Sequence, residues 1–198
     1  MKRIRIVVPN EFADAYKQVM DMIAITNILI TDIDRVIDMS NEKIKQYKES
    51  TQAKFLNEQE TWIRLAIRLL VTSIESTCYK LKQLALLGYQ AHGIVLDEED
   101  VGKLRERTKD GRPKFLPTDE NIKYSFKMLA SAFNHKNMLK CGKEWGTFLK
   151  VLKKRNGLTH PKNKSDLKVL PSDHKDAADT MEWFFKLLNE QVSQPFDL

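Results

Sequence analysis

The sequence predicts an all-α fold, an antiparallel helical bundle with two long N-terminal helices and several shorter ones. Apolar residues recur every three or four positions across residues 12–37 and 56–88, which is the period of a helix with one buried face. Only seven glycines and six prolines occur among the 198 residues, so few positions interrupt long elements. Strand-like alternation is confined to residues 2–8, a stretch too short to form a sheet alone. We expect one domain over 1–198, with a short N-terminal arm at 1–10.

The first long helix is predicted over residues 12–37. One stripe along it is apolar except for Thr26, as expected of a helix that packs lengthwise on another. The pattern continues, more polar, through Ile44 and Tyr47. The stripe consists of Phe12, Tyr16, Val19, Ile23, Thr26, Ile30, Ile33 and Ile37.

The second long helix is predicted over residues 56–88, and its broad apolar face makes it the central helix of the bundle. We expect Gly88 to end it, since glycine is common just after helix C-termini. Its buried face consists of Ile63, Ile67, Leu70, Ile74, Cys78, Leu81 and Leu84, widened by Trp62, Leu65, Leu69 and Tyr79.

A short helix is predicted to begin after Leu96, where four consecutive acidic residues, 97–100, favour the positive end of a helix dipole. A metal site is the alternative for these acids, but they lack the spacing of a calcium-binding loop. Residues 107–118 then form a basic loop that contains an Asp-Gly turn signal and two prolines.

Three further helices complete the predicted bundle. Thr118 is expected to cap the first of them by accepting a backbone hydrogen bond. The second covers residues 142–155, and the last begins near Ser172 or Asp173. The inward faces of the first and last helices consist of Phe126, Leu129, Ala130 and Phe133, and of Ala177, Met181, Phe184, Leu188 and Val192.

Positive charge is concentrated in residues 136–168, which hold ten basic residues against two acidic ones, a net charge of +8 in a chain whose total is +6. Such a field attracts polyanions, and RNA is the expected partner. A solvated lysine-rich surface without a ligand is the plainer interpretation. The expected RNA-binding lysines are Lys150, Lys153, Lys154, Lys162 and Lys164.

Several classes of protein are disfavoured. Cys78 and Cys141 are isolated, which is typical of reduced thiols in the cytoplasm and not of a secreted disulfide framework. We expect no signal peptide and no membrane-spanning helix, because no apolar run is long enough. No nucleotide-binding loop, zinc-protease motif or serine-hydrolase motif is present, and we expect no cofactor and no metal site.

The segment 155–161 reads RNGLTHP and carries the clearest indication of chemistry. Trp145, Phe148, Leu149 and Leu152 precede Arg155 at helical spacing, so Arg155 continues an apolar stripe and requires a partner. This partner could be a carboxylate of the same chain, a group of a facing subunit or a phosphate. Within the chain, Glu75 is a candidate.

His160 is expected at a helix boundary, because Pro161 disfavours helical geometry in the residue before it. Asn156 and Gly157 could loosen this helix end and let Arg155 and His160 point into one pocket. If Gly157 instead ends the helix early, His160 lies out of reach of Arg155.

An arginine and a histidine held together can cleave RNA without a metal. The histidine moves protons, the arginine braces the phosphorane oxygens, and Asn156 can bind a phosphate oxygen or orient the imidazole. The plainer alternatives are a histidine that interacts with the helix dipole and an arginine in a structural ion pair. For the whole chain they are a non-catalytic RNA-, nucleotide- or protein-binding module, or an assembly protein that oligomerises through its first helix.

The segment 155–161 resembles the signature of HEPN domains, in which an arginine and an adjacent polar residue precede a histidine. The resemblance implies an all-helical fold and a catalytic pair of Arg155 and His160, with Asn156 helping to hold the site. It also implies a homodimer whose two motifs face one cleft, acting as an endoribonuclease of toxin or defence type, and an antitoxin similar to a nucleotidyltransferase. Glu75 and Thr159 are expected as supporting residues.

Overall fold

The computed structural model describes residues 13–50 and 53–194, which form six α-helices and one short 3₁₀ helix. The predicted all-α class is therefore confirmed. The elements are α1 (Ala13–Ser50), α2 (Ala53–Ala91), α3 (Glu98–Arg105), α4 (Thr118–Ala132), α5 (Lys143–Thr159), η2 (Lys164–Leu167) and α6 (Pro171–Val192).

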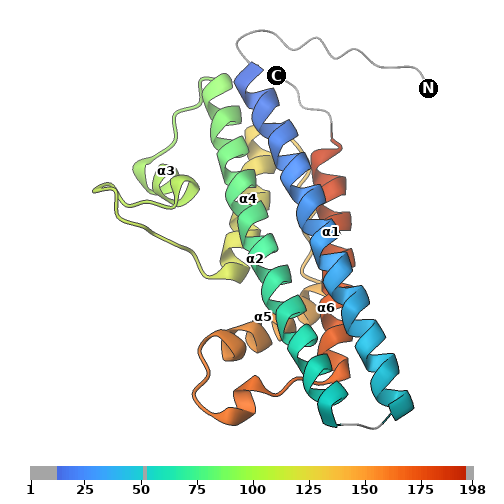
Figure 1. Ribbon diagram of the computed structural model, residues 1–198. Coiled ribbons are helices and arrows are strands. Elements are labelled where there is room, and N and C mark those ends of the chain that lie inside the picture. The colour runs from blue at the N-terminus through green and yellow to red at the C-terminus, as the bar shows by residue number, and fades with distance from the viewer. Residues whose placement is uncertain (1–12, 51–52, 195–198) are drawn as a thin grey trace, which may run out of the picture.

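The two long helices, α1 and α2, run side by side in opposite directions, and α4, α5 and α6 lie behind them in the view of Figure 1. Helix α2 contacts each of the other five α-helices, as expected for the central helix of the bundle. Helix α3 and the loop that follows it project from the side of the bundle (Figure 1).

The hydrophobic core is built around the buried face of α2. Ile63, Ile67, Leu70 and Ile74 recur every three or four residues and are at most 1% exposed, so this face is a continuous apolar surface. Three phenylalanines from different helices, Phe126 of α4, Phe148 of α5 and Phe184 of α6, are also fully buried in this core.

The predicted stripe on α1 can be compared with the structure only near the middle of the helix. Ile33 is fully buried and Ile37 packs against the core, as predicted. The helix also continues past residue 37 to Ser50. The other side chains of the stripe, and the strand-like arm at residues 1–10, lie outside the described part of the structure.

The prediction that Gly88 ends the second helix is wrong, because α2 continues through Gly88 to Ala91. The glycine serves packing instead. A Cβ atom at this position would lie 2.7 Å from Cζ of Phe133 and 3.1 Å from Cβ of Ala132. A residue without a side chain therefore lets the end of α4 approach α2 closely.

Three residues predicted to widen buried faces are exposed. Leu65 and Tyr79 of α2 are 43% and 39% exposed, and Leu149 of α5 is 39% exposed. On α2 the reason is geometric, since residues 65, 68, 72, 75 and 79 share one side of the helix. On this side Arg68 and Glu75 reach α5, but Leu65, Arg68, Thr72 and Tyr79 remain exposed. We call this side, which consists of Leu65, Arg68, Thr72, Glu75 and Tyr79, the open face of α2.

Helix α3 is capped and anchored by polar contacts. Oδ1 of Asp97 accepts a hydrogen bond from the backbone N–H of Asp100 at 2.7 Å, so the cap predicted for the acidic cluster is confirmed. At its other end, the fully buried ammonium of Lys82 pairs with Glu106 and donates to Oδ1 of Asn121 at 2.7 Å. A buried charge requires such partners, and this network joins α2, α3 and α4.

The basic loop forms a hydrogen-bonded turn. The backbone N–H of Thr108 donates to the carbonyl of Arg112 at 2.8 Å, and the N–H of Lys114 donates to the carbonyl of Glu106 at 2.8 Å. Gly111 adopts a φ of +79°, which glycine tolerates without strain. The loop thereby leads directly to the start of α4, where Thr118 lies beside the candidate site described below.

Candidate functional site

Arg155 lies on the inward side of α5 and forms an ion pair with Glu75 of α2. Phe148 and Leu152, on the same side of α5, are 0% and 8% exposed, and the side chain of Arg155 is 18% exposed. Nη2 of Arg155 donates to Oε1 of Glu75. The prediction that Arg155 continues an apolar stripe is confirmed. Glu75, one candidate partner, forms the ion pair that the plainer structural interpretation of Arg155 expects.

Thr118 also belongs to this contact, although the sequence predicts a different role for it. Helix α4 has Pro117 at its N-cap position and no side-chain cap, so the predicted capping by Thr118 is wrong. The Oγ1 hydroxyl of Thr118 donates instead to Oε1 of Glu75 at 2.7 Å, and Nη2 of Arg155 lies 3.4 Å from the same Oγ1 atom. Residues of α2, α4 and α5 therefore fix the guanidinium together.

Helix α5 extends further than predicted and ends at Thr159, so Gly157 does not end it. Leu158 is 1% exposed, which ties the last turn to the core. A guanidinium nitrogen of Arg68 also donates to the carbonyl of Leu158, one of the carbonyls that a helix end leaves unpaired. His160 is the C-cap residue, at the helix boundary that Pro161 predicts.

The segment between α5 and α6 is held at both ends by arginines of α2. Arg68 binds the carbonyl of Leu158, and Nη1 of Arg64 donates to the carbonyl of Leu167 at 3.1 Å. Between them, Oδ2 of Asp166 accepts backbone hydrogen bonds from Lys162 and Asn163 at 2.8 and 3.1 Å. We call residues 158–167 the motif turn. Its backbone is fixed by these contacts, and His160 lies on it.

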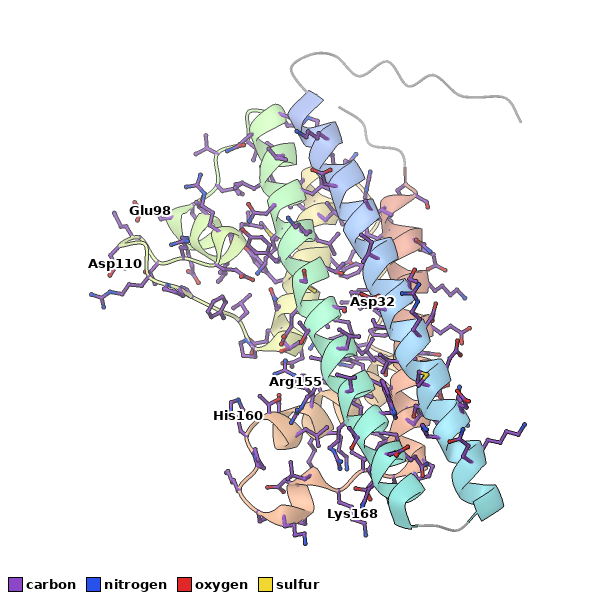
Figure 2. All side chains as sticks on the ribbon, viewed as in Figure 1. Asp32, Glu98, Asp110, Arg155, His160 and Lys168 are labelled. Atoms are coloured by element: carbon purple, nitrogen blue, oxygen red, sulfur yellow. The ribbon has the colours of Figure 1, made fainter. Side chains whose placement is uncertain are left out.

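The two residues of the predicted catalytic pair lie near one another at the C-terminal end of α5 but face different surroundings (Figure 2). Arg155 lines a pocket of about 410 Å³ together with Arg68, Thr72, Glu75 and Thr159. His160 is exposed and is not among the residues that line this pocket. Its backbone N–H donates to the carbonyl of Asn156 at 3.0 Å, and the side chain of Asn156 is exposed on α5.

Thr159, expected as a supporting residue, lies in the last turn of α5 beside the pocket. Its Oγ1 hydroxyl donates to the carbonyl of Arg155 at 2.9 Å, and its side chain lines the pocket. The hydroxyl therefore links the backbone at Arg155 to the last turn of α5.

The predicted RNA-binding lysines do not form one surface. Lys150 and Lys153 are exposed, but the helical period directs them to the opposite side of α5 from Arg155. Lys154 pairs with Asp173 at 3.2 Å and donates to the carbonyl of Lys168, so it anchors α6. Lys162 and Lys164 are exposed on the motif turn, and Lys164 lines a second pocket beside Arg64 of α2.

Sequence reasoning missed Arg68 and Thr72, which line the pocket with Arg155. The signal that could have found them is their spacing, since both fall on the same side of α2 as Glu75. That side reads as ordinary polar surface until Glu75 is known to be the partner of Arg155.

Two features are absent from residues 13–50 and 53–194. No group of three or more histidine, cysteine, aspartate or glutamate side chains within these ranges is arranged to hold a metal ion. No helix in the same ranges combines the length and the apolar character needed to cross a membrane.

Comparison of the chain with protein-family models, curated proteins and solved structures gave no match in any of the three. These comparisons therefore assign the chain to no family.

Proposed function

We propose that this protein is a metal-independent endoribonuclease similar to HEPN domains, with Arg155 and His160 as its catalytic residues. One observation carries the proposal. An arginine fixed by Glu75 beside an open pocket lies five residues before an exposed histidine, and that histidine is on a turn with a fixed backbone. Fixed orientation of charged groups is the main contribution that a protein makes to phosphoryl chemistry without a metal.

Arg155 supplies the positive charge next to the reacting phosphate. Glu75 and Thr118 engage Nη2, which sets the plane of the guanidinium. A guanidinium has five N–H donors, so others remain for phosphate oxygens. Because the charge of Glu75 partly offsets that of Arg155, its stabilisation of the phosphorane rests on aligned hydrogen bonds more than on net charge.

His160 carries the proton transfers. In the proposed reaction the 2′-oxygen of a ribose attacks the adjacent phosphorus, and one imidazole accepts the 2′-hydroxyl proton as the new P–O bond forms. A second imidazole gives a proton to the 5′-oxygen as the P–O5′ bond breaks. The products are a 2′,3′-cyclic phosphate and a 5′-hydroxyl. Histidine suits both steps because it ionises near neutral pH.

This scheme needs two imidazoles at one phosphate, and a second copy of the chain supplies the second. The open face of α2 suits contact between copies, since the apolar side chains of Leu65 and Tyr79 are exposed on either side of the pocket residues. In a twofold dimer the same face meets itself, so the two motifs would share one cleft.

The charge of the surrounding surface supports RNA as the substrate. The motif lies within residues 136–168, whose net charge is +8, and Lys162, Lys164 and Lys168 are exposed beside it. Sequence-independent phosphate contacts of this kind bring the strand to the site.

A second candidate function is a non-catalytic binding module of the same fold. The observation that favours it is that Arg155 is already paired with Glu75, while His160 does not line the same pocket in one protomer. Such a module would bind RNA in a salt-sensitive manner and leave it intact.

Cleavage of a mixed RNA pool in EDTA tests the proposal. We expect the wild type to cut the RNA, and we expect His160→Ala and Arg155→Ala to lose at least a hundredfold in rate while staying folded. Lys127→Gln is the matched control, because Lys127 is exposed on α4 outside the basic segment 136–168, and it should keep nearly full activity. RNA binding without cleavage by a folded wild-type dimer would instead establish the binding module.

A further inference from the structure

The pocket beside Arg155 holds a second arginine whose charge is not balanced. Its lining consists of two guanidinium groups, two hydroxyls and one carboxylate, from Arg68, Arg155, Thr72, Thr159 and Glu75. The carboxylate is committed to Arg155, with which it forms an ion pair. Arg68, Arg155 and Thr72 can each donate a hydrogen bond to an anionic ligand, while the hydroxyl of Thr159 already donates to the carbonyl of Arg155.

Arg68 is the residue that gives the pocket its net positive charge. Its Nη2 atom donates to the carbonyl of Leu158, a neutral group that leaves the charge uncompensated. Among the described residues, no carboxylate lies within ion-pair distance of Arg68. Its remaining N–H groups suit the oxygens of a phosphate, which a guanidinium binds in a planar, two-point geometry.

The neighbouring surface indicates a ligand with more than one phosphate. One helical turn earlier on α2, Arg64 lines a second pocket together with Lys164, Lys168 and Ser165. Glu60 lines this pocket too and pairs with Arg64, so the two lysines supply its excess of positive charge. Cationic groups therefore recur along the line where α2 meets the motif turn. A strand with a phosphate in every nucleotide fits such a repeat, because single-stranded nucleic acids are followed along their backbone by grooves of this kind.

We propose that the pocket of Arg68, Thr72, Arg155 and Thr159 binds a phosphodiester of single-stranded RNA, with Arg68 as the principal cationic contact. This inference rests on the proposed function, because it places the phosphate next to the bond that His160 would act on. Arg68 contacts the carbonyl of Leu158, two residues before His160, so the bound strand lies against the motif turn. A free phosphate ion presents the same oxygens and is the alternative ligand for this pocket.

The test measures binding of the full chain to a 2′-O-methyl RNA oligonucleotide, which lacks the attacking hydroxyl and stays intact. Fluorescence anisotropy over a series of salt concentrations gives both affinity and its salt dependence. We expect Arg68→Gln to weaken binding about tenfold and to reduce the slope of log K against log salt by about 0.7, the value for one phosphate contact on a single strand. Thr72→Val should weaken binding less and leave the slope unchanged.

Arg68→Lys separates binding from a structural effect, since Arg68 also holds the motif turn. A lysine restores the charge, so we expect it to keep the wild-type salt slope. If Arg68→Lys instead loses as much of the slope as Arg68→Gln, a phosphate contact through charge is contradicted. Equal slopes for Arg68→Gln, the Lys127→Gln control and the wild type would also overturn the proposal.

The two proposals fail in different ways. If the wild type cleaves RNA and Arg68→Gln binds the oligonucleotide as well as the wild type does, the proposed phosphate pocket is contradicted and the proposed nuclease activity is supported. If binding depends on Arg68 but ordinary RNA is not cleaved, the proposed phosphate pocket is supported and the proposed nuclease activity is contradicted. Competition with inorganic phosphate identifies the ligand, because an oligonucleotide that binds no more tightly than free phosphate would overturn the assignment to an RNA strand.

Discussion

Glu75 of α2 and Arg155 of α5 lie 80 residues apart in the sequence and form an ion pair in the fold. The pair places a guanidinium at the end of an apolar stripe, where a charge without a partner would be costly. Thr118 of α4 donates to the same carboxylate, so three helices determine where Arg155 points. The proposed chemistry depends on this arrangement, and Glu75 is therefore the first residue to test.

Replacing Glu75 by glutamine should lower both stability and cleavage. The side chains of Glu75 and Arg155 are 38% and 18% exposed, between a surface pair and a buried one, so we expect a loss of about 1–2 kcal/mol in the free energy of unfolding. Cleavage should fall roughly tenfold or more, because the guanidinium loses its fixed orientation. Urea unfolding and RNA cleavage per folded protein measure the two effects.

Glu99→Gln is the matched control, since it removes an exposed ion pair with Lys103 within α3. It should change the unfolding free energy by less than about 0.5 kcal/mol and leave cleavage unchanged. A loss of stability in Glu75→Gln with full cleavage would show that the ion pair is structural and does not position Arg155 for catalysis.

Replacing Tyr79 by glutamate tests the proposed contact between two copies. Tyr79 is 39% exposed on the open face of α2, and a charge there should separate the copies and abolish cleavage. Leu149→Glu alters a side chain with the same 39% exposure on α5, and it should leave the dimer intact. Light scattering after size-exclusion chromatography gives the mass. A Tyr79→Glu protein that stays dimeric and active would place the interface elsewhere.

Two glycines within helices should respond to alanine in opposite directions. At Gly88 an added Cβ would lie 2.7 Å from Phe133, so Gly88→Ala should destabilise the fold by about 1–3 kcal/mol through overpacking. At Gly146 of α5 nothing lies within 4 Å of the added Cβ, so Gly146→Ala should stabilise it by about 0.5–1 kcal/mol. Thermal unfolding distinguishes the two, and shifts of the same sign would contradict the packing assigned to Gly88.

His174 should make stability depend on pH. Burial lowers the pKa of His174 below its ordinary value of 6.5, and its Nε2 atom is buried without a hydrogen-bond partner. The unfolded chain therefore takes up this proton at a higher pH than the folded protein does. The contribution of neutral His174 to the free energy of unfolding is fully present well above pH 6.5, and it is lost as the pH falls from there through the lowered pKa.

The measurement compares the unfolding free energies of the wild type and His174→Gln at pH 7.5 and pH 5.5. The wild type should lose more stability over this interval, because glutamine does not titrate. An equal loss in both proteins would show that other groups cause the dependence.

The fold class could be predicted from the sequence because helical periodicity is a local property. The faces of α2 and α6 that carry apolar residues at this period do enter the core, as Ile67 and Phe184 show. Helix ends were less predictable, because tertiary contacts determine them. Gly88 lies inside α2, where it makes room for Phe133. Gly157 lies inside α5 because the next residue, Leu158, is buried and its carbonyl accepts a hydrogen bond from Arg68.

The candidate site could be predicted only in part. Helical spacing showed that Arg155 lies on an inward face and identified Glu75 as a candidate partner. It did not identify Thr118, which was expected to cap its own helix, or Arg68, whose side of α2 reads as ordinary polar surface. Nor did the concentration of positive charge show which lysines share a surface, since Lys153 lies on the side of α5 opposite Arg155 and Lys162 lies on the motif turn.

The most direct test of the central claim is the chemistry of the ends that the wild type leaves on RNA in EDTA, determined by mass spectrometry. The proposed mechanism predicts 2′,3′-cyclic phosphate and 5′-hydroxyl ends, absent when His160 is replaced by alanine or when every ribose carries a 2′-O-methyl group. Fragments with 3′-hydroxyl and 5′-phosphate ends, or equal cleavage by wild type and His160→Ala, would contradict the mechanism.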